Sequence, residues 1–269
     1  MTSVGVIGAA GRMGREVCAA IRAEPDLVLG AMIDVGFEDD VAAAGLGDII
    51  DTGGAPVVVS DRLDALAEAG VRVAVDFTKA EAAVENIKWC VDHGIHVVVG
   101  TSGIPTEAQA EIAELCGRLG GHVLIAPNFA IGAVLAMKFA EMAAAWMPDA
   151  EVIELHHSGK LDSPSGTALN TVDAILRGRK AAPAARPGAL TESLPGARGA
   201  SKDGVHVHSV RLPGLVAHQE VIFGGPGQTL SIRHDSIDRK SFMPGVVVAV
   251  REIGRHPGLT VGLEKYLGL

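Results

Sequence analysis

The hydrophobic residues of this chain follow one pattern in its first half and a different pattern beyond it. In the first half, short apolar runs of the kind that form buried parallel strands alternate with segments whose apolar residues recur at helical spacing. The runs lie at residues 4–7, 27–33, 56–59, 71–75, 95–99 and 122–126. The helical segments lie at residues 15–23, 62–69, 81–93 and 106–119. This alternation predicts an α/β fold with a Rossmann-like, doubly wound parallel sheet.

Two local features of this first part lead to further expectations. Thr106 and Gln109 have the spacing of a capping box, so the helix at residues 106–119 is predicted to begin there. Residues 37–61 are rich in glycine and acidic side chains and are expected to form a surface excursion around one short strand.

A second domain with a different sheet is predicted for residues 131–239. A helix at residues 131–146 leads out of the first domain, and partial alternation at residues 150–156 then predicts a strand. The later patterns are a helix at 167–177, an exposed loop at 178–200, and strands at 205–211, 217–223 and 229–234, the last two joined by a turn at 224–227. This run of strands predicts an α+β domain whose sheet joins neighbouring subunits. A final helix at 241–253 is expected to return, so that residues 1–130 and 240–269 form one domain.

The composition is that of a soluble globular protein and argues against several classes of function. Of the 269 residues, 48% are hydrophobic and 20% are charged, which is enough for a large core. A net charge of −9 and an aromatic content of 3% argue against a nucleic-acid partner. No stretch has the apolar length of a membrane span, and the glycine-broken start is unlike a signal peptide. Cys18, Cys90 and Cys116 lack paired or metal-like spacing and are expected to be buried thiols of a cytoplasmic protein.

Gly8, Gly11 and Gly14 stand between the first predicted strand and the first predicted helix. They form a variant of the dinucleotide fingerprint, whose glycines allow a tight turn, close approach of a pyrophosphate and close helix–strand contact. The second apolar run ends in Asp34, where a carboxylate would bind the ribose hydroxyls of a cofactor. The glycines alone also fit a structural turn or another nucleotide. Together with Asp34 they predict a nicotinamide dinucleotide site in the domain of residues 1–130 and 240–269.

Small or polar residues follow five of the strands predicted in this domain. They lie at residues 8–14, 34, 76–79, 100–102 and 126–129. Each set alone fits ordinary turn chemistry, and Phe77 and Phe129 equally fit a hydrophobic core. Because ligands of doubly wound sheets bind beyond the carboxyl ends of the strands, the sets together predict one long ligand lying across them.

Val35 follows the predicted ribose-binding acid, so this position offers no guanidinium for the 2′-phosphate of NADPH. We therefore expect NADH or NADPH as the cofactor, with NADH favoured. Arg12 and Arg15 lie close by in the sequence and could serve a phosphate.

Three side chains that can carry protons, His156, His157 and Lys160, lie within five residues of each other. The alternative is that the histidines are ordinary strand residues with a structural role. Beside a site for an anion, such side chains favour an active site for an acidic small molecule.

That anion site is predicted at the start of the following helix. Ser163 is expected to be its N-cap, with Pro164 at the first helical position. The N–H groups of Ser165, Gly166 and Thr167 would then point out of a helix N-terminus, which suits a carboxylate. The alternative is that Ser-Pro-Ser-Gly only begins a helix.

Two other classes of function fit the sequence less well. His206 and His208 lie two apart on one predicted strand, but no cysteine or carboxylate has a matching spacing, so we predict no metal site. A regulatory protein that senses a dinucleotide without turnover would need no proton donor, and the presence of both His156 and Lys160 argues against it.

The motifs together resemble the 4-hydroxy-tetrahydrodipicolinate reductase family, also called the dihydrodipicolinate reductases. Residues 154–168 are the most specific part of the resemblance, whereas the glycine motif is shared by many dehydrogenases. Further similar segments lie at residues 8–14, 76–78, 100–103, 126–129 and 208–220. The resemblance implies a homotetrameric enzyme of the diaminopimelate route to lysine. Such an enzyme reduces a cyclic dicarboxylate, 4-hydroxy-2,3,4,5-tetrahydrodipicolinate, to 2,3,4,5-tetrahydrodipicolinate with NADH or NADPH.

The resemblance also implies roles for individual residues. His156 matches the catalytic acid/base of the family and Lys160 its proton donor, while His157, Gly166 and Thr167 match substrate contacts, to which we add Ser165. Cofactor contacts are implied for Gly8, Ala9, Ala10, Gly11, Arg12, Met13, Asp34, Gly100, Thr101, Ser102, Ala126, Pro127, Asn128 and Phe129. Arg239 is a further candidate for a substrate carboxylate. Two positions depart from the family pattern, Val35 where a basic residue is frequent and Ser102 where threonine is common.

Overall fold

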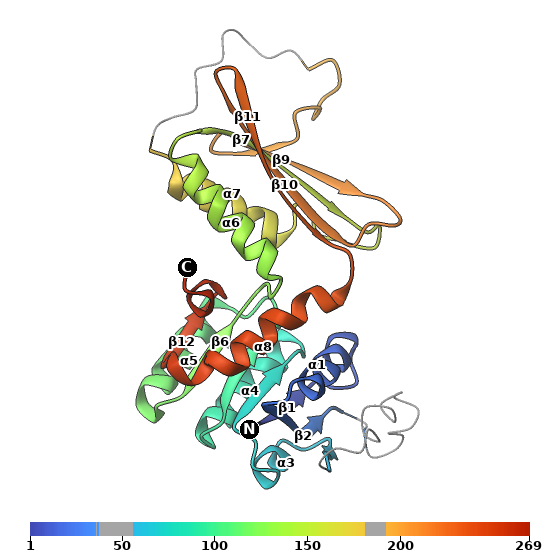
Figure 1. Ribbon diagram of the computed structural model, residues 1–269, viewed down its shortest axis with the longest axis vertical. Coiled ribbons are helices and arrows are strands. Elements are labelled where there is room, and N and C mark those ends of the chain that lie inside the picture. The colour runs from blue at the N-terminus through green and yellow to red at the C-terminus, as the bar shows by residue number, and fades with distance from the viewer. Residues whose placement is uncertain (36, 38–55, 181–191) are drawn as a thin grey trace. The chain divides into compact units, whose positions relative to one another are not determined.

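The computed structural model describes residues 1–35, 37, 56–180 and 192–269 and divides into two compact units (Figure 1). The first unit consists of Met1–Phe129 and Phe242–Leu269, and the second of Ala130–Ser241. Most of the excursion expected at residues 37–61 and part of the loop expected at 178–200 lie outside the described residues. No described helix is long and apolar enough to cross a membrane.

The first unit is built on a seven-stranded sheet with the strand order β12-β6-β5-β4-β1-β2-β3, in which all neighbouring strands are parallel. Its strands are β1 (Thr2–Ile7), β2 (Leu27–Ile33), β3 (Val58–Ser60), β4 (Val73–Asp76), β5 (His96–Val99), β6 (His122–Ile125) and β12 (Gly258–Val261). The predicted doubly wound, Rossmann-like sheet is therefore confirmed. The sequence did not reveal β12, because Gly258–Val261 lacks the continuous apolar run that marks the equally short strands β4, β5 and β6. Since the strands are parallel, their carboxyl ends lie on one edge of the sheet.

Helices on the two faces of this sheet complete the first unit. They are α1 (Arg12–Ala23), α3 (Asp64–Glu68), α4 (Ala80–Asp92), α5 (Thr106–Leu119) and α8 (Met243–Glu252), with short 3-10 turns at Ile253–Arg255 and Glu264–Leu267. Helix α1 packs against α8, and α4 packs against α5 (Figure 1). Alternate strand residues such as Val97 and Val99 share one core with Ile87 of α4 and Ile112 of α5. The cysteines of α1, α4 and α5 are free and buried, as expected.

The start of α5 differs from the prediction. The helix begins at Thr106, but its N-cap is Pro105 and no side chain caps it, so the predicted capping box is wrong. A capping box requires threonine at the non-helical cap position, whereas Thr106 is already helical. Gln109 reaches back instead, and its Nε2 donates to the carbonyl oxygen of Ile104 over 2.9 Å.

The second unit is a five-stranded mixed sheet with the order β11-β10-β7-β9-β8, as the sequence pattern of strands and few helices predicts. Its strands are β7 (Asp149–His156), β8 (Ala200–Lys202), β9 (Val205–Arg211), β10 (Ala217–Gly225) and β11 (Gln228–Ser236). The central pair β7 and β9 is parallel, and the hairpin of β10 and β11 extends the sheet beside β7. The short strand β8 was not predicted, and it begins at the last residue of the loop predicted at 178–200.

Two helices, α6 (Ile131–Ala144) and α7 (Gly166–Gly178), cover one face of this sheet (Figure 1). The burial of β7 alternates along the strand, and Val152 packs with Ala140 of α6, Val172 of α7 and Phe223 of β10 in the core of the unit. A 3-10 turn at Arg239–Phe242 follows the sheet. In the described residues the opposite face, which includes Glu151 and Ile153, has no helix packed on it.

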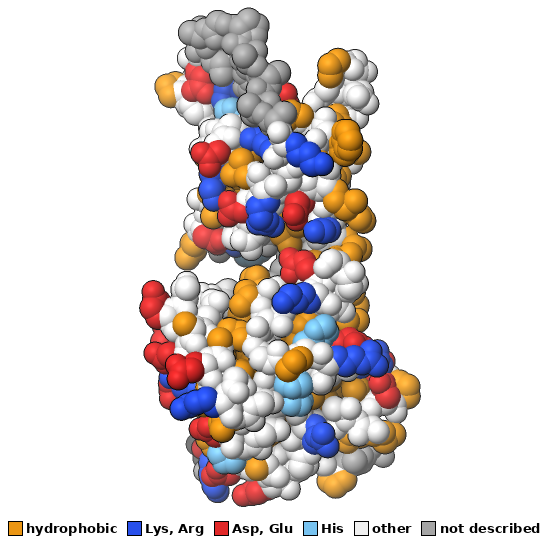
Figure 2. Space-filling model, turned by 90° about the vertical axis from the view of Figure 1, so that its left-hand side faces the viewer, with side chains coloured by type: hydrophobic (Ala, Val, Ile, Leu, Met, Phe, Trp, Pro, Cys, Tyr) orange, Lys and Arg blue, Asp and Glu red, His pale blue; other side chains and the backbone are white. Residues whose placement is uncertain are grey.

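Charged side chains of both signs are distributed over the molecule. Acidic and basic side chains are interspersed over the face shown in Figure 2, without a continuous basic stripe. This distribution, with the net charge of −9, differs from the basic surface that binding to a phosphate backbone requires.

A comparison of two helical glycines tests the packing of the first unit. A Cβ on Gly245 of α8 would lie 2.0 Å from the carbonyl oxygen of Phe129, whereas a Cβ on Gly117 of α5 would meet nothing within 4 Å. We expect Gly245→Ala to lower the free energy of unfolding by about 1–3 kcal/mol, because backbone must move. Gly117→Ala should raise it by about 0.5–1 kcal/mol through helix propensity. Urea unfolding measures both, and a Gly245→Ala variant as stable as the parent would contradict this account of the packing.

Candidate active site

The turn of Gly8–Gly14 is held in place by protein contacts at the carboxyl end of β1. Gly8 has a φ of +82°, and a Cβ on Gly14 would lie 2.0 Å from the carbonyl oxygen of Gly8, so both positions require glycine. Asp34 Oδ2 accepts the N–H of Ala10 over 2.8 Å, and Oδ1 accepts that of Val35 over 2.8 Å. Gly11 is the N-cap of α1, and no side chain caps this helix. The first turn of α1 thus has the form of an anion-binding helix start.

The neighbouring strand ends are joined by a buried acid, Asp76, at the end of β4. Its side chain is fully buried and accepts from the hydroxyl of Thr78 over 2.7 Å and from Asn86 Nδ2 of α4 over 2.7 Å. Thr101 Oγ1, after β5, donates to the carbonyl oxygen of Thr78 over 3.1 Å. A Cβ on Gly100 would lie within 2.1–2.3 Å of the Phe77 ring, so this strand end also needs glycine. These contacts fix the edge of the sheet on which the predicted cofactor residues lie.

The predicted cofactor residues are brought to this one edge, but they differ in exposure. Gly8, Ala9, Thr101, Ala126 and Phe129 are buried, Ala10, Met13, Asp34, Gly100 and Asn128 are intermediate, and Gly11, Arg12, Ser102 and Pro127 are exposed. The Phe129 ring packs against that of Phe77, with 5.9 Å between ring centroids, as a core aromatic does. A ligand along this edge would therefore meet mainly backbone and a few polar side chains.

In the second unit the predicted site lies between the end of β7 and the start of α7. The N-cap of α7 is Ser165, two residues after the predicted Ser163, so the assignment of Ser163 as N-cap with Pro164 at the first helical position is wrong. Ser165 Oγ accepts the N–H of Ala168 over 3.2 Å, and the Ser165 N–H itself donates to Glu154 Oε1 over 3.3 Å. The contact between Ser165 and Glu154 of β7 anchors the helix start, and the local sequence does not predict it.

The shift changes which residues form the helix start. Gly166 and Thr167 occupy the first two helical positions, at the positive end of the helix dipole. A Cβ on Gly166 would meet nothing within 4 Å, so open space borders the chain here. Ser165, by contrast, uses both its N–H and its hydroxyl within the protein.

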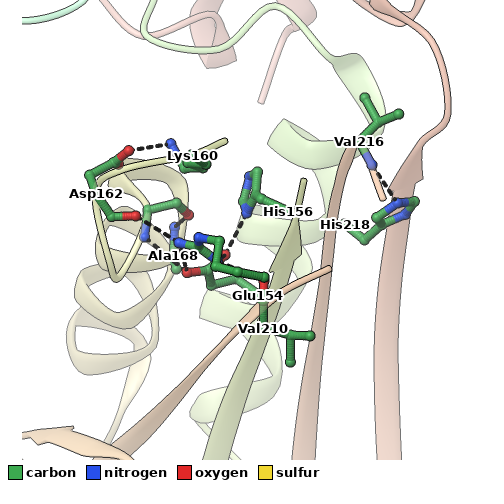
Figure 3. A network of polar contacts seen from close by, with 10 residues as sticks. Glu154, His156, Lys160, Asp162, Ala168, Val210, Val216 and His218 are labelled. Atoms are coloured by element: carbon green, nitrogen blue, oxygen red, sulfur yellow. Dashed lines mark hydrogen bonds and ion pairs between the residues drawn. The ribbon is translucent and has the colours of Figure 1, made fainter. Parts of the chain in front are cut away.

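Glu154, His156 and Arg211 form a compact polar network beside this helix start (Figure 3). Glu154 is fully buried, and its Oε2 lies 2.5 Å from His156 Nδ1. Arg211, at the end of β9, binds the carboxylate in bidentate fashion, Nη1 to Oε2 and Nη2 to Oε1, each over 2.8 Å. The parallel pairing of β7 with β9 sets His156 opposite Arg211 and so makes the network possible.

The charges of this network follow from its surroundings. Burial raises the pKa of Glu154, but hydrogen bonds from Arg211, Ser209 and His156 outweigh it and hold the pKa below its ordinary value. For His156, burial lowers the pKa and Glu154 raises it, while the charges of Lys160 and Arg211 lower it further, so that the pKa lies below its ordinary value. Near neutral pH the pair is therefore a carboxylate and a neutral imidazole.

Lys160 and His157 lie on the loop after β7. Lys160 Nζ donates to Asp162 Oδ1 over 2.7 Å, and Arg211 Nη2 donates to the carbonyl oxygen of Asp162 over 2.7 Å, which ties this loop to the network (Figure 3). His157 is exposed. Arg239 is exposed in the 3-10 turn that follows β11.

Sequence reasoning missed Glu154 and Arg211 as parts of the site. Glu154 had a usable signal, because it stands two residues before His156 and alternate strand residues share a face. Arg211 lies in the segment 208–220 that contributed to the resemblance, but its contact with Glu154 depends on strand pairing across 57 residues. His206 and His208, the two histidines of strand β9, form hydrogen bonds within the protein. His208 contacts Glu151, and His206 contacts the carbonyl oxygen of Arg198.

Comparisons with known proteins agree along the whole chain. Residues 2–129 match the family model described as dihydrodipicolinate reductase, N-terminus, and residues 132–267 match that described as dihydrodipicolinate reductase, C-terminus. The chain is similar to the 4-hydroxy-tetrahydrodipicolinate reductase of Nocardia farcinica, with 51% identity covering 99% of this chain and 98% of the relative. It is also similar to that of Corynebacterium aurimucosum, with 50% identity and the same coverage of both chains.

Solved structures give the same result. The structure of a dipicolinate-bound dihydrodipicolinate reductase from Paenisporosarcina superposes with a TM-score of 0.87 and 38% identity, covering 98% of this chain and 99% of that chain. A probable dehydrogenase from Thermotoga maritima, with a TM-score of 0.66 and 11% identity over 98% of this chain and 92% of that chain, shares the fold alone.

Proposed function

The chain belongs to the dihydrodipicolinate reductase family, and we propose that its substrate binds in the second unit beside His156, Lys160 and the first turn of α7. The enzyme reduces 4-hydroxy-2,3,4,5-tetrahydrodipicolinate to 2,3,4,5-tetrahydrodipicolinate with NAD(P)H, on the diaminopimelate route to lysine. The observation that carries the site assignment is the position of Glu154, which contacts both His156 Nδ1 and the N–H of Ser165. One buried carboxylate thus joins the proton carrier to the helix start.

The chemistry defines what the residues must supply. Substrate and product differ by the 4-hydroxyl group, so the reaction adds a hydride and a proton and releases water. The reduced nicotinamide, when bound, supplies the hydride. The protein must deliver the proton, and Lys160 is the proposed donor, with His156 as the acid/base beside it. The charge of Lys160 acts on His156, which supports a common place of action for the two.

The two substrate carboxylates need donors and positive charge. Gly166 and Thr167 stand at the first two positions of α7, where the helix N-terminus favours an anion, and Gly166 borders open space. We propose that one carboxylate binds there, with exposed His157 as a further contact and Arg239 as a candidate for the other carboxylate. Ser165, expected from the sequence to donate its N–H, is proposed instead to position the helix, because Glu154 accepts that N–H.

The residues at the strand ends of the first unit fit a dinucleotide. Gly8 and Gly14 can accept no Cβ, the start of α1 is not capped by a side chain, and Asp34 lies beside the turn. We propose that the α1 start binds the pyrophosphate and that Asp34 binds ribose hydroxyls, since each carboxylate oxygen keeps a lone pair beyond the one that accepts a backbone N–H. Gly100–Ser102 and Ala126–Phe129 are proposed to contact the cofactor further along the same edge.

Val35 supports a preference for NADH. Its side chain is 88% exposed directly after Asp34, so no cation at this position can meet a 2′-phosphate. Arg15 Nε donates to the carbonyl oxygen of Ala10, which fixes part of that side chain, whereas Arg12 is exposed and is the remaining candidate cation.

The sheet of the second unit supports association into a homotetramer, the state that the family resemblance implies. Its face opposite α6 and α7 carries apolar side chains such as Ile153 and Ile222 beside the charged pairs Glu151–Arg198 and Glu220–Arg233. A broad face of mixed apolar and paired charged residues is suited to a second copy of the same face.

The proposed roles are tested by coupling the purified chain to a dihydrodipicolinate synthase reaction and following loss of reduced-cofactor absorbance. The parent should oxidise cofactor, and Lys160→Ala and His156→Ala should each lower kcat by about 10²-fold or more. Lys138→Ala, a surface change on α6, is the matched control and should leave kcat unchanged. Cofactor affinity should persist in all variants, and a variant with lost cofactor affinity but normal turnover would refute the assigned roles.

Val35→Arg tests the cofactor preference. A guanidinium beside Asp34 can form charge-assisted hydrogen bonds to a 2′-phosphate, so the ratio of kcat/KM for NADPH to that for NADH should rise by about 10-fold. Val35→Met is the uncharged control and should leave the ratio near that of the parent. An unchanged ratio in Val35→Arg would show that this position does not govern the choice.

Sedimentation velocity tests the assembly. We expect a particle of four chains, and Ile153→Arg should shift it to smaller species by placing an unpaired charge in the proposed interface. Leu119→Arg, on the exposed end of α5, is the control and should leave the particle intact. A parent chain that sediments as a monomer contradicts the proposed state.

A further inference from the structure

Glu154 is a buried carboxylate whose negative charge is stabilised by hydrogen-bond donors of the protein. Its side chain is completely inaccessible, and Arg211 binds both of its oxygens. The N–H of Ser165 and the side chain of Ser209 add further hydrogen bonds. An isolated buried charge would be unstable, so these donors are what allow Glu154 to remain ionised.

An ionised carboxylate can only accept hydrogen bonds, and this determines which ring nitrogen of His156 carries the proton. Because Glu154 Oε2 lies 2.5 Å from Nδ1, that nitrogen must carry the proton. Nε2 of the neutral ring is then the nitrogen with a free lone pair. The ring can take up a proton at Nε2 but has none to give there until it has done so.

The same carboxylate positions the parts of the site around the ring. Its Oε1 holds the N-cap residue of α7, and Arg211 links it to the carbonyl oxygen of Asp162, whose side chain binds Lys160. The groups that act on His156 are thus Glu154 from its own strand, Arg211 from β9, and Lys160 from the loop, while its β10 neighbour Ala217 is uncharged.

We propose that Glu154 is a positioning residue of the reductase, which holds His156 in the Nδ1–H form so that Nε2 can accept a ring C–H proton of the substrate and return it to the hydroxyl that leaves as water. Lys160 donates the one proton that the reduction consumes and regains it from solvent. Arg211 keeps Glu154 ionised. This inference rests on the proposed role of His156 and makes that role specific, since it assigns the acceptor function to His156 and the donor function to Lys160.

Glu154→Gln is the critical variant because Ser165 dictates how the amide must lie. Arg211 donates to both oxygen positions and so favours neither orientation, whereas the Ser165 N–H requires the amide oxygen at the Oε1 position and leaves the amide NH₂ at the Oε2 position, facing Nδ1. The NH₂ group donates to Nδ1 and forces the ring proton onto Nε2. We expect the Nε2–H form in ¹⁵N NMR spectra of the imidazole, with the His156 signal assigned by its absence in His156→Gln. We also expect kcat to fall by about 10²-fold.

The pH dependence of the His156 titration and of kcat/KM gives a second readout, which a simple loss of packing at Glu154 would not change. Glu154 raises the pKa of His156, so its replacement should lower the NMR titration midpoint of His156. In the parent, protonation of Nε2 removes the acceptor, so kcat/KM should fall as the pH drops through the His156 pKa. In Glu154→Gln this acid limb should move to lower pH, with the residual rate still well below that of the parent.

The double variant Glu154→Gln/Arg211→Met distinguishes a folding defect from loss of the proposed positioning role. It removes both charges of the buried pair. Breaking one partner of such a pair can cost about 3–5 kcal/mol, whereas removing both can be nearly neutral. The double variant should therefore regain stability but not turnover. Recovery of parent kcat in the double variant, or an unchanged Nδ1–H form in Glu154→Gln, overturns the proposal. Absence of reductase activity in the parent would instead refute the proposed function, because the tautomer is measured without substrate.

Discussion

A carboxylate that is cut off from water must be surrounded by donors, and the second unit is organised around this requirement at Glu154. The donors come from three elements: His156 from β7, Arg211 and Ser209 from β9, and Ser165 from the start of α7. Their meeting depends on the parallel register of β7 with β9, in which Glu154 stands opposite Ser209 and His156 opposite Arg211. A change of register by one residue would turn these side chains to opposite faces of the sheet and leave the carboxylate unpaired. The charge therefore couples the sheet register to the geometry of the site.

Two acids at strand ends of the first unit also accept hydrogen bonds from the protein. They differ in how far protein donors fill their hydrogen-bonding positions. Asp76 is fully buried, and the groups that donate to it come from its own turn, from α4 and from Thr101 after β5. It therefore serves structure, by fixing the strand end beside Thr78. Asp34 is only partly covered, and each oxygen accepts one backbone N–H. It can fix the glycine turn and still accept from a ligand, because each carboxylate oxygen has two lone pairs. Exposure and remaining hydrogen-bond capacity separate the acid that holds the fold from the acid that is suited to bind.

How much of this was visible in the sequence depended on whether each feature is local. The parallel sheet, the mixed sheet and most helices follow from the spacing of apolar residues, and residues 154–168 carried the family resemblance. The short strands β8 and β12 were missed because neither contains a continuous apolar run, unlike the similarly short β4, β5 and β6. The N-cap of α7 was misplaced because both Ser163 and Ser165 are good caps locally, and only Glu154 on β7 decides between them. The contact of Arg211 with Glu154 required the strand pairing itself, which no local pattern contains.

The proposed roles of Lys160 and His156 depend on a difference in charge between the two side chains. A lysine ammonium and a neutral imidazole can act as donor and acceptor at the same pH, whereas two cations or two neutral groups could not divide the task in this way. The network maintains the difference, because burial and the charges of Lys160 and Arg211 all disfavour a proton on His156 Nε2, while Glu154 keeps the proton on Nδ1. Asp162, which binds Lys160 and whose backbone is held by Arg211, connects the donor to the same framework. In the proposed mechanism, Glu154 and Arg211 thus decide which group donates a proton and which accepts one, and both act through His156.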